Sequence, residues 1–301
     1  MSGADLAVVN LETPLTARGR NETKTFVFRT PTAFANTLAS NGIDVVSLAN
    51  NHMLDYGRIG LTDTLEALRA AKVEATGAGS NLADALRPVR LRFGQTCVAV
   101  LAASQIIPAV HWVASTGHPG IVSAGKHRFD TNTVRLLTAV SEAKRANDVV
   151  IVIMHWGIEG DPCPSPIQIQ LGRELAMAGA TVVLGAHPHV LQPIVSMTDP
   201  KGQNHLIAYS MGNFIWDPRS GATGDTGVLE VRFNGASPAG FTFFPHRLDG
   251  DGWARSVPAQ EVLGQRITQR VARACGPIRG QAAMASPPTT APAPAQEPTR
   301  P

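Results

Sequence analysis

The sequence is poor in cysteine and in charged residues. It has three cysteines, Cys97, Cys163 and Cys275, in 301 residues, and charged residues make up 16% of the chain. The cysteines form no pair with the spacing of a metal site and are too few for a disulfide framework, so they leave the redox compartment open. The basic residues form no block and do not alternate with aromatic residues, which argues against a nucleic-acid partner. The net charge of +3 suits an anionic ligand.

Long hydrophobic runs are also missing. No apolar run approaches the roughly 20 residues that span a bilayer, so we expect no membrane span in this chain. Residues 1–5 show neither the basic segment nor the apolar segment of a signal peptide. These absences leave the localisation undetermined.

Hydrophobic residues are plentiful, at 44% of the chain, and can form a substantial core. The composition changes after about Ala274, and residues 287–301 are rich in Pro, Ala and Thr without any large apolar residue. Such a segment cannot bury enough surface to offset its ordering entropy. The sequence therefore predicts one domain over residues 1–274 and a disordered tail over residues 275–301.

The middle of the chain carries two apolar, β-branched runs, residues 149–154 and 181–186, with a helical pattern between them. Ser165 and Gln168 have the spacing of a capping box at the start of a helix, and Gly179 fits its end. Short apolar runs joined in this way are typical of buried parallel strands with a crossover helix. The sequence therefore predicts an α/β fold.

Residue types that bind metals follow the predicted strands. The strands expected over residues 5–11, 43–48, 149–154 and 181–186 are followed by Glu12, by Asn51 and His52, by His155, and by His187 and His189. The carboxyl ends of strands in open α/β sheets gather functional groups, so we expect these side chains at one edge. Carboxylate, amide and imidazole groups without cysteine suit a divalent ion such as Zn, Mn or Fe. A metal there would lower the pKa of water and polarise a phosphoryl oxygen.

Each group also has an ordinary explanation. A single histidine at a strand end is usually capped or solvated, Asn51-His52 is typical of a turn, and Glu12 could be a solvated strand end. The joint pattern favours a metal site over these separate explanations. The segment over residues 104–132 reads as an irregular insertion, and for its histidines we predict no metal binding: His111, His118 and His127.

Five segments resemble the successive motifs of the CapA family, the poly-γ-glutamate capsule biosynthesis proteins. They are Asn-Leu-Glu-Thr-Pro-Leu at 10–15, residues 47–57 with Asn-Asn-His, His-Trp-Gly-Ile-Glu at 155–159, Gly-Ala-His-Pro-His at 185–189, and Tyr-Ser-Met-Gly-Asn-Phe at 209–214. The resemblance covers roughly residues 4–250. The family is similar in fold to the calcineurin-like metallophosphoesterases, so the resemblance implies a four-layer αββα sandwich with a dinuclear site.

The resemblance also implies roles for single residues. Glu12 takes the place of a bridging carboxylate, and His52 matches the histidine that protonates the leaving group. Glu159, four residues after His155, could orient a ligand. For Asn213, a role beside the ligands and a turn-forming role both stay open. The positions that match metal-binding residues of the family are Asn51, His155, His187 and His189.

One departure from the family concerns its first strand, which ends in Gly-Asp and supplies a metal-binding Asp. This chain starts at Met1, where the family's second strand begins, so we expect a fold that lacks the first strand. Either the start is misplaced, with a signal or anchor upstream and an extracytoplasmic location, or the protein is shortened. Glu12 is the only carboxylate among the assigned ligands. Close divalent ions repel each other without intervening carboxylates, so we expect this chain to hold at most one ion tightly and a longer form to hold two.

Three functions remain open from the sequence. The leading one is a CapA-like protein of poly-γ-glutamate biosynthesis, with one or two ions of Mn, Zn or Fe, an anionic polymer as substrate and other capsule-synthesis proteins as partners. The second is a metal-dependent phosphoesterase with His52 as the acid. The third is a non-catalytic binding or assembly factor. Metal content together with phosphoesterase turnover would separate them.

Overall fold

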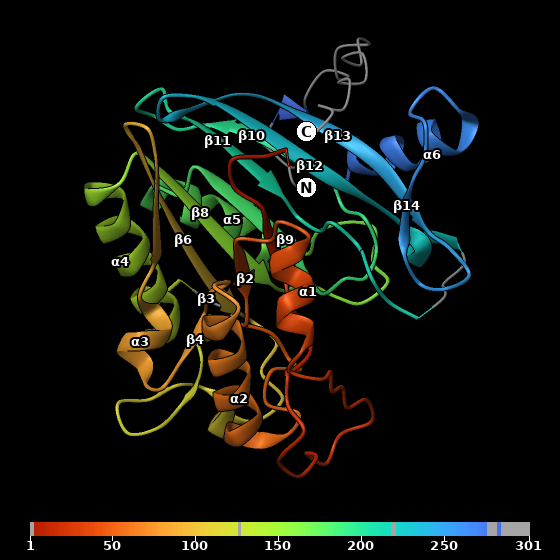
Figure 1. Ribbon diagram of the computed structural model, residues 1–301. Helices are drawn as coiled ribbons and strands as arrows, with labels where there is room; N and C mark the ends of the chain where they lie inside the picture. The colour runs from red at the N-terminus through yellow and green to blue at the C-terminus, as the bar shows by residue number, and fades with distance from the viewer. Residues whose placement is uncertain (1–2, 126–127, 218–220, 276–281, 284–301) are drawn as a thin grey trace, which may run out of the picture.

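The computed structural model describes residues 3–125, 128–217, 221–275 and 282–283. Its largest sheet has seven strands in the order β15-β10-β11-β9-β8-β6-β5 (Figure 1). The central strands β11, β9, β8 and β6 are parallel, whereas β5 and β10 run antiparallel to the strands beside them. The strands are β5 (Val89–Phe93), β6 (Thr96–Ser104), β8 (Val149–His155), β9 (Val182–Ala186), β10 (Ile194–Thr198), β11 (Asn204–Ala208) and β15 (Ala282–Ala283).

The predicted parallel pair with its crossover helix is confirmed. Every residue of β8 is buried, as expected for a strand covered on both faces. Helix α5 (Pro166–Ala178) connects β8 to β9. The Ser165 hydroxyl accepts a hydrogen bond from the Gln168 backbone N–H, and the Gln168 side chain accepts one from the Ser165 N–H. Gly179 ends the helix with φ 115°, a left-handed conformation that favours glycine.

Two smaller sheets form the second β-layer. β1, β2 and β3 are parallel, and β1 pairs only with β2 within the described part of the chain. β12, β13 and β14 form an antiparallel sheet. The bounds are β1 (Val8–Asn10), β2 (Val45–Ser47), β3 (Glu74–Thr76), β12 (Asp225–Asn234), β13 (Ser237–Leu248) and β14 (Ala254–Ser256).

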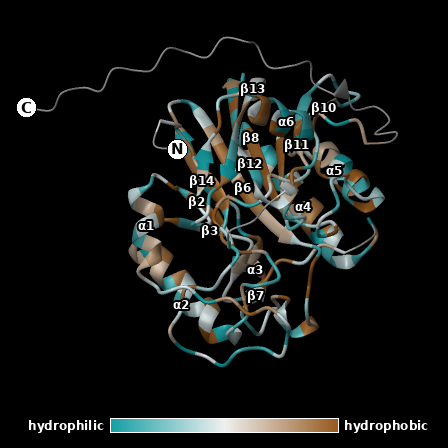
Figure 2. Cartoon of the chain, turned by 90° about the vertical axis from the view of Figure 1, so that its right-hand side faces the viewer, coloured by the Kyte–Doolittle hydropathy of each residue, from teal (hydrophilic) through white to brown (hydrophobic). Residues whose placement is uncertain are grey.

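Three hydrophobic cores hold the layers together. One lies between the β-layers and includes Val45, Ile153 and Phe243. The second packs α4 (Thr131–Ala146) and α5 on the outer face of the large sheet, and the third packs α1 (Phe34–Ser40) and α2 (Gly57–Ala70) on β1–β3. Figure 2 shows hydrophobic residues concentrated on the interior strands. The layers are therefore helix, sheet, sheet, helix, the αββα order that the resemblance implies.

Shorter elements complete the described chain. The segment over residues 104–132 is mostly irregular, as expected, but contains the short elements η1 (Val110–Trp112) and β7 (Gly120–Ile121). α6 packs on β13 through its buried Ile267. No described helix is both long and apolar enough to cross a membrane. The remaining elements are β4 (Ala78–Gly79), α3 (Leu82–Leu86), η1 (Val110–Trp112), β7 (Gly120–Ile121), η2 (Gly221–Gly224) and α6 (Val262–Val271).

A disulfide joins Cys163, just before α5, to Cys275, just after α6. The sequence does not reveal it, because three cysteines do not show which of them meet in space. Cys97 is the free one. Cys275 and the short strand β15, which pairs with β10, fall inside the range 275–301 that the sequence assigns to a tail. Within that range, residues 276–281 and 284–301 lie outside the described residues.

Candidate metal centre

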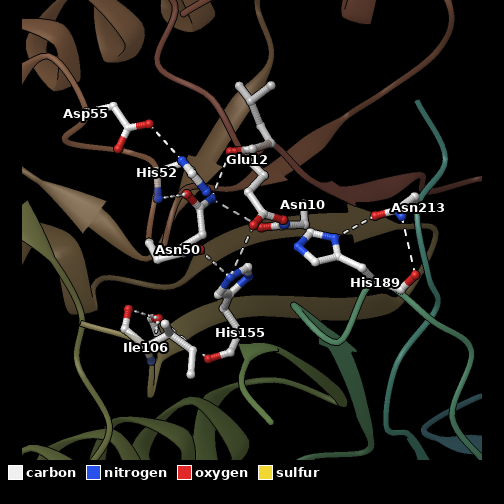
Figure 3. Close-up of polar contacts among 12 residues, drawn as sticks. Asn10, Glu12, Asn50, His52, Asp55, Ile106, His155, His189 and Asn213 are labelled. Atoms are coloured by element: carbon white, nitrogen blue, oxygen red, sulfur yellow. Dashed lines mark hydrogen bonds and ion pairs between the residues drawn. The ribbon is translucent and has the colours of Figure 1, made fainter. Parts of the chain in front are cut away.

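The carboxyl ends of β1, β2, β8 and β9 meet at one place. Figure 3 shows Glu12, His52, His155, His189 and Asn213 close together there. His155 is the last residue of β8, and its Nε2 lies 2.7 Å from Asn51 Oδ1 and 3.4 Å from Glu12 Oε1. The ring centroids of His155 and His187 are 4.8 Å apart, and those of His187 and His189 are 5.9 Å apart. The structure thus brings together all five residues for which the sequence suggests metal binding.

Three of these residues form a group that could hold a metal ion. One ligand atom from each of Glu12, His187 and His189 lies within 4.8 Å of the others. Several polar atoms around this group are buried without a hydrogen-bond partner in the described part, including Glu12 Oε1, His155 Nδ1 and His187 Nδ1. Buried polar atoms are rarely left unpaired, because this costs free energy. A carboxylate and imidazoles with unpartnered atoms fit a divalent cation.

The electrostatics agree with this fit. Burial raises the pKa of Glu12 to about 8, and burial together with neighbouring His189 and His52 lowers the pKa of His187 to about 4. Burial, followed by the neighbouring histidines, holds the pKa of His155 well below its usual range. The imidazoles of His155 and His187 are therefore neutral near pH 7, as metal ligands must be. The hydrogen bond from Asn10 and the charge of Lys24 lower the pKa of Glu12 but do not offset the effect of burial.

The turn after β9 has an unusual backbone. His187 has φ 98° and His189 has φ 58°, and only one other described non-glycine residue, Lys72, has a positive φ. Left-handed conformations of this kind cost free energy in non-glycine residues and gather at functional sites. The turn places two histidines on either side of Pro188 so that both face Glu12. The sequence predicts a tight turn here but not that the histidines themselves adopt it.

Asn213 has a clear contact with this group. The distance from His189 Nδ1 to Asn213 Oδ1 is 2.7 Å, so the imidazole N–H donates to the amide oxygen and leaves Nε2 as the free nitrogen (Figure 3). The Asn213 amide nitrogen donates to the backbone oxygens of His189 and Thr223. These bonds fix both the ring and the backbone of His189. Partners that orient a ligand's imidazole in this way are common around metal sites.

His52 lies at the edge of the group, held by residues that the sequence does not single out. Its Nδ1 is 2.7 Å from Asp55 Oδ2, and the Lys24 ammonium is 2.6 Å from Asp55 Oδ1. The Phe28 backbone N–H also donates to Asp55, and the Phe28 ring stacks on His52 with centroids 4.0 Å apart. Burial lowers the pKa of His52 despite Asp55. Asp55 therefore orients His52 and fixes the loop that carries Phe28.

The profile of the family described as "Bacterial capsule synthesis protein PGA_cap" matches residues 1–218, which include the whole group. The chain belongs to this family. The matched residues include every strand-end residue of the group, from Glu12 to His189, and Asn213.

Two curated relatives in this family carry capsule names. "PGA biosynthesis protein CapA" of Bacillus subtilis is 30% identical over 75% of this chain and 57% of its own length. "Capsule biosynthesis protein CapA" of Bacillus anthracis is 37% identical over 65% of this chain and 46% of its own length. This chain therefore spans about half the length of the curated relatives it matches.

Among solved structures, the NAD nucleotidase of Haemophilus influenzae is similar with a TM-score of 0.45 and 13% identity, covering 79% of this chain and 48% of that one. A likeness of this size says nothing about activity.

The other expected residues of this PGA_cap chain are placed as follows. Glu159 is exposed and makes no hydrogen bond in the described part, and its charge acts on Glu12 from a distance. His111 lies 3.5 Å from Glu22, and His118 contacts the backbone oxygen of Pro119, both apart from the group. Lys126 and His127 lie outside the described residues.

Proposed function

We propose that this chain binds one divalent ion through Glu12, His187 and His189 and acts as a metal-dependent hydrolase in the handling of poly-γ-glutamate. The observation that carries the proposal is the convergence of Glu12, His187 and His189, together with the burial of Glu12 Oε1 and His187 Nδ1 without a hydrogen-bond partner in the described part of the chain. Manganese, zinc and iron suit this donor set. The polymer comes from the names of the two curated relatives.

In this proposal, different residues of the chain have different roles. A divalent ion would lower the pKa of water and polarise the bond to be cleaved. His155 and Asn51, which lie beside Glu12 and pair with each other through Nε2 and Oδ1, would border the ion. His52, whose Nδ1–H donates to Asp55, takes a proton at its free Nε2 from the attacking water and then gives it to the leaving group. The aromatic ring of Phe28 covers His52 and limits the access of bulk water to it.

The disulfide supports a location in the cell envelope. Structural disulfides persist mainly in oxidising compartments and are rare in the cytosol. Cys163 and Cys275 form such a bond between segments far apart in the chain. Capsular polymers lie outside the cytoplasm, so we propose that the protein works there.

Metal analysis combined with turnover tests the proposal. The purified protein is dialysed, its metal content is measured by mass spectrometry, and the shortening of poly-γ-glutamate is followed by gel filtration. We expect about one ion per chain and loss of turnover in His52→Gln with the ion retained. A protein that binds no divalent ion, or whose turnover survives complete removal of metal, would contradict the proposal.

One observation favours a second candidate, a metal-dependent phosphoesterase. The oriented His52–Asp55 pair beside the metal-type group can protonate the alcohol that leaves a phosphoester. Bis(4-nitrophenyl) phosphate and 4-nitrophenyl phosphate serve as test substrates. Turnover of these esters that depends on His52, without any shortening of the polymer, would select this candidate. An ion with neither turnover would select a binding or assembly factor.

A further inference from the structure

A cluster of arginines from β13 and α6 surrounds one buried acid, Asp225. Asp225 begins β12 and its side chain is fully buried. Arg247 of β13 donates a hydrogen bond to it, and Arg270 of α6 lies 2.6 Å from its other oxygen. A third guanidinium, that of Arg266, lies 3.6 Å away. One negative charge thus faces three positive charges.

The positive charge exceeds what the buried acid requires. Two close arginines already occupy both oxygens of Asp225, and a buried carboxylate needs such partners to offset its desolvation. Arg266 adds no hydrogen bond within the described residues and is 54% exposed. Arg273 is also exposed and lies just beyond the end of α6. The surplus charge of Arg266 and Arg273 is therefore directed at solvent.

The cluster is connected to the candidate metal centre through one short turn. Arg247 also donates to the backbone oxygen of Gly221 in η2. The backbone oxygen of Thr223, in the same turn, accepts a hydrogen bond from Asn213, which in turn holds His189. The Thr226 hydroxyl donates to the backbone of Met211 and fixes the start of β12 beside the same loop. The arginine cluster and the metal centre thus lie on two sides of η2.

We propose that Arg247, Arg266, Arg270 and Arg273 form a docking surface for an acidic polymer that carries repeated carboxylates, and that this surface presents the polymer to the metal centre. Guanidinium groups bind carboxylates in a planar, two-pronged geometry. With a rise of 1.5 Å per residue, helical positions 266 and 270 are about 6 Å apart along α6, and residue 273 lies several ångströms further. An extended polymer can therefore contact several of these groups at once, which strengthens binding.

The inference rests on the proposed function, because a polymer of γ-linked glutamate supplies the carboxylates. A purely structural role, fastening α6 to β13, explains the close contacts of Arg247 and Arg270 but not the exposed Arg273, and Arg266 adds only a longer contact of 3.6 Å while 54% of its side chain is exposed. The double variant Arg266→Gln/Arg273→Gln keeps both close contacts of Asp225. A loss of polymer binding in this variant can therefore be distinguished from a loss of folding.

Fluorescence anisotropy with fluorescein-labelled poly-γ-glutamate tests the surface. We expect the double variant to bind about tenfold more weakly than the wild type at low salt, with a shallower dependence on salt concentration. Arg69→Gln/Arg145→Gln is the matched control, since it removes two exposed helical arginines from α2 and α4 and gives the same net charge. The control should bind like the wild type, and all three proteins should unfold at the same temperature.

Other outcomes would overturn the inference. If the control variant bound poly-γ-glutamate as weakly as the double variant, net charge alone would explain the effect. If the wild type did not bind the polymer, there would be no docking surface. Inorganic polyphosphate that displaces the label as well as unlabelled poly-γ-glutamate would contradict a carboxylate polymer as the occupant. Binding by His189→Ala separates the two proposals: docking should persist in this variant even if the metal and the turnover are lost.

Discussion

Single residues in this site act through their backbone as well as their side chains. His187 and His189 both occupy the left-handed region, which is unfavourable for residues with a Cβ atom. Each such residue costs of order 1–3 kcal/mol unless its surroundings enforce it. Here Pro188 fixes the middle of the turn, and Asn213 forms hydrogen bonds with both the ring and the backbone oxygen of His189. The strain is consistent with a geometry selected for ligand binding rather than for stability.

Replacing His189 with Ala should remove the metal. The imidazole supplies one of three ligand atoms that lie within 4.8 Å of one another. We expect the dialysed His189→Ala protein to hold almost no divalent ion in mass-spectrometric analysis. His118→Ala is the control, because His118 contacts only a backbone oxygen and its loss should change stability by at most about 0.5 kcal/mol. Equal metal retention in both variants would exclude His189 as a ligand.

Asn213 should act on the metal through His189. Losing an outer partner of a ligating histidine typically weakens metal affinity about 10–100-fold, and we expect this for Asn213→Ala in a competition assay with a chelating dye. Asn213→Asp keeps the acceptor oxygen and should recover much of the affinity. Asn41→Ala, which removes an exposed amide at the end of α1, should have no effect. Unchanged affinity in Asn213→Ala would leave Asn213 with a turn-forming role alone.

At the scale of elements, local signals predict well what local interactions determine. The capping box at Ser165 and the apolar run of β8 identify the crossover unit, because caps and periodicity are encoded within a few residues. The same signals do not identify α6, whose buried residues pack against strands distant in the chain. The hydrogen bond from His189 to Asn213, 24 residues away, is likewise invisible in either motif alone.

The convergence of the strand ends is the part of the site that topology makes predictable. Parallel strands of one layer end at the same edge, so Glu12 and Asn51 must approach each other, as must His155 and His187. What brings these two pairs together is the packing of one sheet on the other, which the sequence implies only through resemblance to a family. Asp55 and Lys24 escape prediction because their roles depend on a loop without regular structure.

Gly185 should be essential for the end of β9. A Cβ atom at this position would lie 1.8 Å from the backbone oxygen of Tyr209 and 2.5 Å from Trp156 Nε1, where these two groups form a hydrogen bond. Gly185→Ala must push β9 away from β11, and overpacking of this kind typically costs about 1–3 kcal/mol. Thermal unfolding followed by circular dichroism should show a clear drop. Gly250→Ala, which meets nothing within 4 Å, is the matched control and should leave the midpoint nearly unchanged.

At the scale of the whole molecule, the disulfide joins the loop after β8 to the segment after α6. Cys163 lies in the loop after β8. In this loop, the Gly160 backbone N–H donates to the Pro188 backbone oxygen, and the Cys163 backbone oxygen accepts a hydrogen bond from the Gln192 side chain. Cys275 follows α6, which carries the arginine cluster. The bond therefore ties the loop that supports the histidine turn to the helix proposed to dock the polymer.

Removing this bond should lower stability and loosen the link between the two regions. The cysteines are separated by 112 residues, and cross-links that close loops of about 100 residues stabilise a fold by up to about 5 kcal/mol through the unfolded chain. We expect Cys163→Ser/Cys275→Ser to unfold roughly 10 °C below the wild type in scanning calorimetry. A reducing agent should lower the wild type to the same midpoint and leave the variant unchanged. Cys97→Ser, which removes the free cysteine, should behave like the wild type. A wild type insensitive to reductant that nevertheless titrates with three free thiols would show that the bond does not form.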